Sequence, residues 1–209
     1  MNGKPLSRTA KEFVAEVAYG FKEVASHAFV GPWEVSRYFI NEIERIESGP
    51  EDLKGNEILI TLEIASGVSF DKLRKYWERL SIKERKEAIH KIKQAMAAFG
   101  LIAVVGTITI NARPPQKEEI LRIALKYDKG EIDYEELVSD VEDVLWPTEE
   151  KKARNWKEIE EYRNAMALAK YLPTEIVKRI IKTYFIDMIR LGMFDGFLPI
   201  PNVYPRLLE

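Results

Sequence analysis

The residues best suited to chemistry lie on a predicted helix from Ile82 to Phe99. At 100° per residue, isoleucine and methionine gather on one face; lysine, histidine and glutamine gather opposite, with two lysines on the flanks. Lysine ammonium groups neutralise phosphates and release counterions, and lysine and glutamine also pair with base edges in the major groove. The predicted nucleic-acid-binding residues are Lys83, Lys86, His90, Lys91, Lys93 and Gln94. Such a surface suits double-stranded DNA.

Charge is distributed unevenly around this helix. The chain carries a net charge of −2, which by itself predicts no nucleic-acid partner. Yet residues 71–93 contain nine Lys and Arg against four Asp and Glu, whereas residues 131–150 contain nine acidic residues and no basic one. Glu87 can also pair with Lys83 and Lys91 at four-residue spacing. The pattern therefore fits either a DNA-binding surface or a salt-bridged helix face in solvent.

Other kinds of chemistry have little support in the sequence. The chain has no Cys, and its two histidines, His27 and His90, are not spaced as metal ligands. In residues 128–133 the glycine is third, whereas an EF-hand calcium loop needs it sixth. The sequence contains neither a glycine-rich phosphate loop nor a nucleophile motif. We therefore predict a non-enzymatic protein with no cofactor and no metal.

The sequence also bears on the compartment. No apolar run approaches the length of a membrane span, and the longest, Leu101 to Ile110, is interrupted by Gly106 and threonines. The N-terminus leads into an amphipathic helix rather than a signal-peptide core. We expect a cytoplasmic protein without a membrane partner. Its charged fraction of 32% and its scarcity of glutamine are typical of thermophile surfaces.

Helical periodicity and breaker residues divide the chain into three predicted regions. Residues 1–55 contain two amphipathic helices, which either pack on the rest of the chain or form a homodimer interface. Residues 56–113 form a central module. Residues 114–209 form a helical region that ends in a Pro-rich tail, and this tail packs on its own domain or contacts a partner, such as a second copy.

The central module presents a helix, a Gly-Val-Ser turn, a second helix, the basic helix, and a short β-rich run after Gly100. Its stretches Glu57-Ile-Leu, Gly67-Val-Ser-Phe-Asp-Lys-Leu and Phe99-Gly-Leu-Ile resemble the winged helix-turn-helix family. The resemblance implies that the helix at 82–99 enters the major groove and that residues 103–110, which lack Lys and Arg, form the wing. It implies a DNA-binding protein, such as a transcriptional regulator or a plasmid or viral accessory protein. We expect a mainly α fold with a small β element.

Some features allow a second interpretation. Residues 57–66 alternate like a strand, yet Asn56 and Gly67 are suitable caps for a helix. Strands at 57–65 and 101–110, if paired, would give an α+β module. Residues 57–73 and 119–137 share a pattern that fits either duplication or chance. Without DNA binding, the acidic stretch, the N-terminal helices and the tail would be the working surfaces of a helical protein-interaction or structural subunit.

Overall fold

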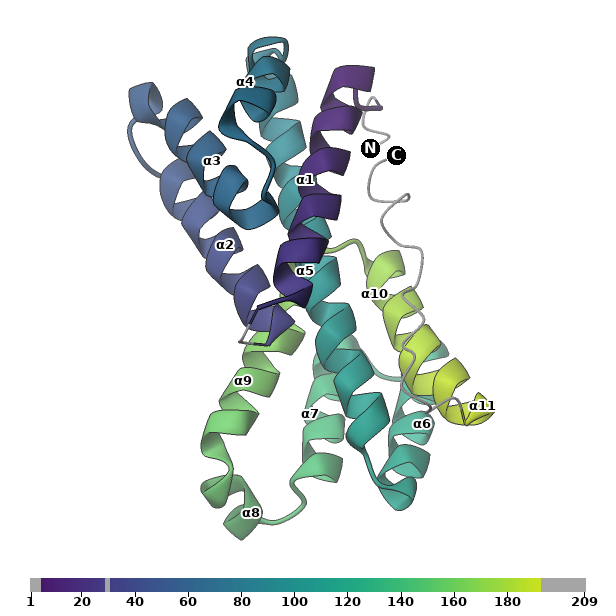
Figure 1. Ribbon diagram of the computed structural model, residues 1–209. Helices are drawn as coiled ribbons and strands as arrows, with labels where there is room; N and C mark the ends of the chain where they lie inside the picture. The colour runs from purple at the N-terminus through teal and green to yellow at the C-terminus, as the bar shows by residue number, and fades with distance from the viewer. Residues whose placement is uncertain (1–4, 29–30, 193–209) are drawn as a thin grey trace. The chain divides into compact units, whose positions relative to one another are not determined.

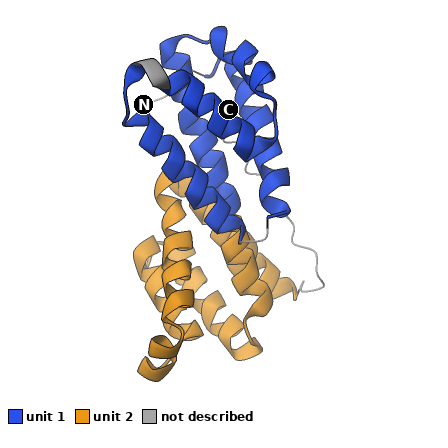
Figure 2. Cartoon of the chain, turned by 60° about the vertical axis from the view of Figure 1, so that its left-hand side comes forward, with its two compact units in different colours: residues 1–100, 202–209 blue, residues 101–201 orange. Residues whose placement is uncertain are grey.

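The computed structural model describes residues 5–28 and 31–192, and every regular element in these ranges is a helix (Figure 1). The predicted mainly α fold is therefore confirmed. Contacts divide the chain into two compact units, with the boundary between Gly100 and Leu101 (Figure 2). This boundary differs from the predicted three-part division, because the N-terminal helices pack on the start of the predicted central module. The Pro-rich tail lies outside the described residues.

The described part of unit 1 consists of four helices and the beginning of a fifth. They are α1 (Arg8–Ser26), α2 (Pro32–Glu47), α3 (Glu51–Ser66), α4 (Phe70–Glu78) and the first part of α5 (Ile82–Asn111). Ser7 Oγ accepts a hydrogen bond from the Ala10 amide at 3.2 Å, and Ser69 Oγ accepts one from the Lys72 amide at 3.3 Å. These bonds satisfy amides that the first turns of α1 and α4 leave free. Gly67 ends α3 in the left-handed conformation, with φ of 69°.

Aromatic rings fill much of the core of unit 1. Helix α1 packs against α3 and α4, and α2 packs against α3. The Phe13 ring meets Trp77 at a centroid distance of 6.0 Å, and the Phe21 ring meets Phe39 at 6.4 Å and Phe99 at 5.9 Å. These edge-on contacts add to the burial of apolar surface that holds the four helices and α5 together.

The β structure expected in the centre of the chain is not found in the described ranges. Residues 57–66 lie within α3, which settles that ambiguous segment as helix, and residues 101–110 lie within α5. The predicted β-rich run and the alternative strand pairing are therefore wrong for these residues. Helix α3 begins at Glu51 rather than after Asn56, and Gly100 lies inside α5 instead of ending it. Burial outweighs the β propensity of the branched residues that follow Gly100.

Helix α5 is apolar over most of its length. The hydroxyls of Thr107 and Thr109 donate to carbonyl oxygens four residues earlier, at 2.7 and 2.9 Å, which satisfies them within the helix. Within the described ranges, α5 is the one helix long and apolar enough to cross a membrane, so our expectation that no run approaches that length was wrong. Most of its apolar stretch is buried, which is also the character of a core helix.

Unit 2 continues from α5 through a series of shorter helices. They are α6 (Pro114–Asp128), α7 (Tyr134–Leu145), α8 (Glu149–Arg154), α9 (Trp156–Met166), the 3-10 helix η1 (Ala167–Tyr171), α10 (Thr174–Ile181), the π-helix η2 (Lys182–Met188) and α11 (Ile189–Leu191). The last three follow one another directly. Helix α6 packs on α7 and η2, and α7 packs on α9.

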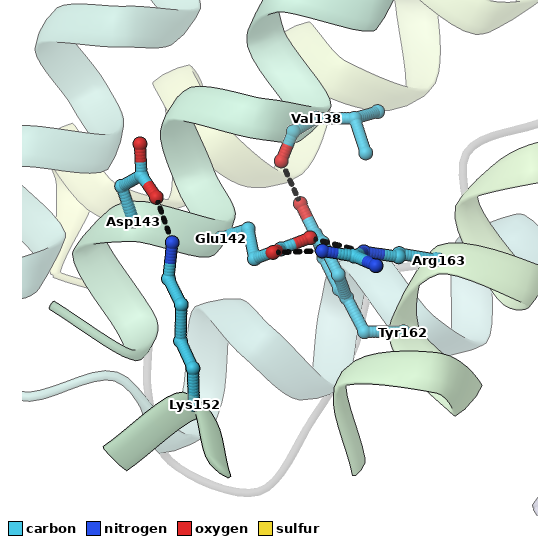
Figure 3. Close-up of polar contacts among 6 residues, drawn as sticks. All are labelled: Val138, Glu142, Asp143, Lys152, Tyr162 and Arg163. Atoms are coloured by element: carbon cyan, nitrogen blue, oxygen red, sulfur yellow. Dashed lines mark hydrogen bonds and ion pairs between the residues drawn. The ribbon is translucent and has the colours of Figure 1, made fainter. Parts of the chain in front are cut away.

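Hydrogen bonds join α7 to α9 in unit 2 (Figure 3). Arg163 donates from Nε and Nη2 to the two carboxylate oxygens of Glu142, at 2.8 and 2.7 Å. The Tyr162 hydroxyl donates to the Val138 carbonyl oxygen at 2.7 Å. Glu142 is almost fully buried, so this two-point pairing compensates the loss of water around its carboxylate.

Candidate nucleic-acid interface

The start of α5 is fixed against α4 by local contacts. Ser81 Oγ accepts from the Glu84 amide at 3.2 Å, and the Glu84 carboxylate accepts from the Ser81 amide at 2.8 Å. Arg85 then donates from Nε to the Trp77 carbonyl oxygen at 3.0 Å, and its guanidinium carbon lies 5.0 Å from the centre of the Trp77 ring. These contacts fix the start of α5 relative to the end of α4, and with it the backbone positions of the cations on both helices.

Lys83, Lys86 and His90 follow one another along the exposed face of α5, over about two turns. Lys83 is 79% exposed and its Nζ lies 3.9 Å from the Glu87 carboxylate, which makes a loose pair. Lys86 is exposed and forms no ion pair with a described residue. This part of the predicted face is accessible to a partner.

The other three predicted residues lie differently. Lys91 is half-buried on the flank of α5. Lys93 is only 14% exposed, because its Nζ pairs with Glu47 at the end of α2 at 2.8 Å. Gln94 is buried, and its Oε1 has no partner among the described residues. The prediction of a glutamine facing solvent is therefore wrong, since α5 enters the core of unit 1 after His90. Gln94 cannot contact bases in this arrangement.

The imidazole of His90 contributes little positive charge at neutral pH. Loss of water around the ring lowers its pKa below the usual range, and the neighbouring charges of Lys93 and Lys91 lower it further. The Glu47 carboxylate acts in the opposite direction, with a smaller effect. The neutral ring can still donate or accept one hydrogen bond, so His90 is a polar contact rather than a cation.

Helix α4 adds cations that were not among the predicted site residues. Lys75 and Arg79 are exposed and form no ion pair with a described residue, whereas Arg74 pairs with Glu78 at 2.7 Å and Lys72 pairs with Glu16 at 3.1 Å. These four cations belong to the excess of Lys and Arg over residues 71–93, so the sequence already indicated that this helix is basic. We call Lys75, Arg79, Lys83 and Lys86 the basic surface.

The acidic stretch of residues 131–150 is not a uniform solvated face. Asp133 caps α7 by accepting from the Glu136 amide at 2.8 Å, and Glu142 is buried against Arg163. Asp143 pairs with Lys152 at 2.7 Å. In the part of the chain that the structure describes, no group of three His, Asp or Glu residues is arranged to hold a metal ion. Several of these carboxylates therefore have structural roles within unit 2.

The basic surface offers ammonium and guanidinium groups at positions that water, phosphate or carboxylate can reach. Such groups bind phosphate by charge and need no particular base sequence. No protein-family model, curated protein or solved structure matches the chain. The geometry of the basic surface is therefore what a functional assignment must be built on.

Proposed function

We propose that the chain is a non-enzymatic protein that binds double-stranded DNA through the phosphate groups of its backbone, with the basic surface as the contact. The observation that carries this proposal is that four cations close in sequence are all exposed: Lys75 on α4, Arg79 at its C-cap, and Lys83 and Lys86 in the first turns of α5. Three of the four have no carboxylate partner among the described residues, so their charges are available to a ligand.

The proposal rests on phosphate contact rather than on reading of bases. Gln94, the residue best suited to pair with adenine, is buried in unit 1. Residues 103–110, where the winged helix-turn-helix resemblance implied a wing, are helical and part of α5. DNA binding in this form predicts weak sequence preference and strong dependence on salt.

A salt titration tests the proposal. A fluorescently labelled DNA duplex is titrated with the full chain at several salt concentrations, and affinity is followed by fluorescence anisotropy. Each phosphate contact contributes about 0.9 to the slope of log affinity against log salt. Replacing Lys75, Lys83 and Lys86 of the basic surface together by alanine should therefore weaken binding and flatten the slope by about 2 to 3.

A matched control separates a specific surface from general charge. Lys151, Lys157 and Lys178 are exposed lysines of unit 2. Replacing all three by alanine changes the net charge by the same amount and should leave the slope nearly unchanged. Equal effects of the two triple variants, or no salt-dependent binding by the wild-type chain, would overturn the proposal.

A second candidate function, self-association through α2 and α3, is favoured by a different surface of unit 1. Ile60 and Ile64 lie one turn apart on α3 and are 52% and 64% exposed, and Tyr38 on the neighbouring α2 is 60% exposed. Exposed apolar side chains on two neighbouring helices suit a contact between copies. Sedimentation velocity would show a dimer for the wild-type chain and a monomer after Ile60→Glu and Ile64→Glu. A monomeric wild-type chain would exclude this function.

A further inference from the structure

Unit 2 contains a pocket that the basic surface does not explain. Its volume is about 530 Å³, within the range of small-molecule sites. It is a cleft open to solvent, lined by residues of α6, α7, α9, η1 and α10, and its lining is mainly apolar. The apolar lining residues that are buried or half-buried are Val138, Met166, Ala169, Leu172 and Val177.

Two tyrosines link the helices that line this pocket. The Tyr134 hydroxyl on α7 donates to the Met166 carbonyl oxygen at the end of α9, at 2.7 Å. The ring of Tyr134 also meets the ring of Tyr127 on α6 edge-on, at a centroid distance of 6.2 Å. Burial raises the pKa of the Tyr134 hydroxyl far above its usual range, so it remains a neutral donor. These contacts fix the side of the pocket that α6, α7 and the end of α9 form.

The charges at the pocket are not equivalent. Arg163 uses Nε and Nη2 to bind Glu142, so most of its charge is already compensated. Lys170 is exposed, lies over the Tyr171 ring with its Nζ 5.0 Å from the centroid, and forms no ion pair with a described residue. One carboxylate, that of Glu135, also reaches the lining. Lys170 is therefore the cation best placed to meet a charged ligand.

The beginning of α10 favours the same sign of charge. Thr174, its first residue, lines the pocket, and the N-cap residue is Pro173, which has no side-chain acceptor for the free amides of the first turn. Free amides and the helix dipole attract negative charge. Lys170 and Thr174 both line the pocket, so the ammonium group and this helix end favour the same sign of ligand charge beside an apolar lining.

We propose that this pocket binds a small amphipathic monocarboxylate, with its hydrocarbon part against Val138, Met166 and Val177 and its carboxylate toward Lys170. An amine of the same size is disfavoured because it would meet Lys170 and the amides of α10, with only Glu135 to attract it. The site lies wholly within unit 2, so it does not depend on DNA binding by the basic surface.

Isothermal titration calorimetry with the full chain tests the proposal. Decanoate, decan-1-ol and decylamine, each below its aggregation concentration, have the same chain and differ in the charge of the end group. Decanoate should bind most tightly. Lys170→Gln should weaken decanoate about fivefold and leave decan-1-ol unchanged. Lys157 is a matched control because its Nζ also lies over a ring, that of Trp156, outside the pocket. Lys157→Gln should change neither affinity.

A second measurement locates the ligand. Decanoate should shift the methyl NMR signals of Val138, Met166 and Val177 but not those of Val14 and Val17 in the core of unit 1. Val138→Phe, which fills the pocket, should abolish binding of both decanoate and decan-1-ol. The proposal is overturned by absence of binding, by shifts confined to unit 1, by tighter binding of the amine or alcohol, or by equal effects of Lys170→Gln and Lys157→Gln.

Discussion

In unit 1 the helices are held together mainly by close packing, including edge-on contacts between aromatic rings, whereas in unit 2 partly buried hydrogen bonds join α7 to α9. A Cβ atom built on Gly20 of α1 would lie 2.3 Å from the carbonyl oxygen of Ser66 on α3, so these helices touch backbone to backbone. In unit 2, side chains of α7 and α9 are linked through Tyr134, Tyr162 and Arg163. The two units therefore have different weak points.

The buried polar atoms show the same difference. Among the described residues, the buried side-chain atoms without a hydrogen-bond partner are Trp33 Nε1, Ser36 Oγ and Gln94 Oε1, and all three lie in unit 1. Packing density decides stability in a core of that kind, so an added atom is costly. In a core joined by hydrogen bonds, removal of one polar partner is costly because the other is left unsatisfied. Substitutions that add or remove single groups can test this difference.

Gly20→Ala should have the largest effect. The added methyl group cannot avoid the Ser66 carbonyl oxygen without separating α1 from α3, and we expect the free energy of unfolding to fall by about 2–3 kcal/mol. Urea denaturation followed by circular dichroism measures this. Hydrogen exchange should show faster exchange in α1 and α3 than in unit 2.

Gly55→Ala is the control for this substitution. Gly55 lies in α3, and a Cβ atom there would be 3.3 Å from Trp77 Nε1, at a side chain rather than a backbone. The gain in helix propensity of about 1 kcal/mol offsets the small adjustment of the ring. If Gly55→Ala destabilised the chain as much as Gly20→Ala, the close approach of α1 and α3 would not be what limits unit 1.

Arg163→Ala should have the next largest effect and should act in unit 2. It leaves the buried Glu142 carboxylate without its two hydrogen bonds, and we expect a loss of about 2 kcal/mol because the arginine side is open to water. Lys152→Ala removes a more exposed pair with Asp143 and should cost at most about 0.5 kcal/mol. Urea denaturation compares both variants. Equal losses of unfolding free energy in the two variants would show that burial of Glu142 does not strengthen its pairing with Arg163.

The sequence predicted local features of this fold better than its long helix. The helix end predicted at Gly67 depends on residues next to one another, and Gly67 does end α3. The continuation of α5 through Gly100 depends on burial by helices far away in the sequence. A run of branched residues reads as a strand when its surroundings are unknown.

The same limit applies to the candidate site: features set by local spacing were predicted, and those set by distant helices were not. Helical spacing correctly placed Lys83 and Lys86 on an exposed face, but spacing alone does not say where a neighbouring helix covers that face. Lys93 pairs with Glu47 at the end of α2, and Gln94 is buried, so neither residue lies on the accessible surface. The pocket of unit 2 had no local signal, because its lining comes from five helices between Tyr127 and Val177.

Removal of one hydroxyl group should lower the free energy of unfolding when the hydroxyl is hydrogen-bonded, as in Tyr134 of unit 2. It should raise the free energy of unfolding when the hydroxyl has no partner in the described part of the chain, as in Ser36 of unit 1. Tyr134→Phe removes the donor to the Met166 carbonyl oxygen and should cost about 1 kcal/mol. Ser36→Ala removes a buried hydroxyl that has no partner among the described residues, and improves helix propensity, so it should raise the free energy of unfolding by about 0.5 kcal/mol. Thermal and urea unfolding of both variants show whether each free energy of unfolding rises or falls.

Ser66 of unit 1 is a control that separates the effect of a missing hydrogen-bond partner from the effect of the unit in which the hydroxyl lies. Ser66 is also buried, but its Oγ donates to the Leu62 carbonyl oxygen and accepts from the Val68 amide at 3.2 Å. Ser66→Ala should therefore destabilise, like Tyr134→Phe and unlike Ser36→Ala. Destabilisation by Ser36→Ala would mean that its hydroxyl contributes to unit 1, contrary to the comparison.

The smallest effect concerns the pH dependence of stability and should come from His90, which lies in unit 1. The pKa of His90 is lower in the folded chain than in the unfolded chain, because burial and nearby lysines disfavour the charged ring. The unfolded state therefore binds more protons as pH falls below the ordinary histidine pKa of about 6.5, and stability declines there. His90→Gln should reduce that decline. The free energy of unfolding, measured by urea denaturation between pH 5 and 8, compares this variant with the wild-type chain. An unchanged decline in His90→Gln would assign the pH dependence to another group.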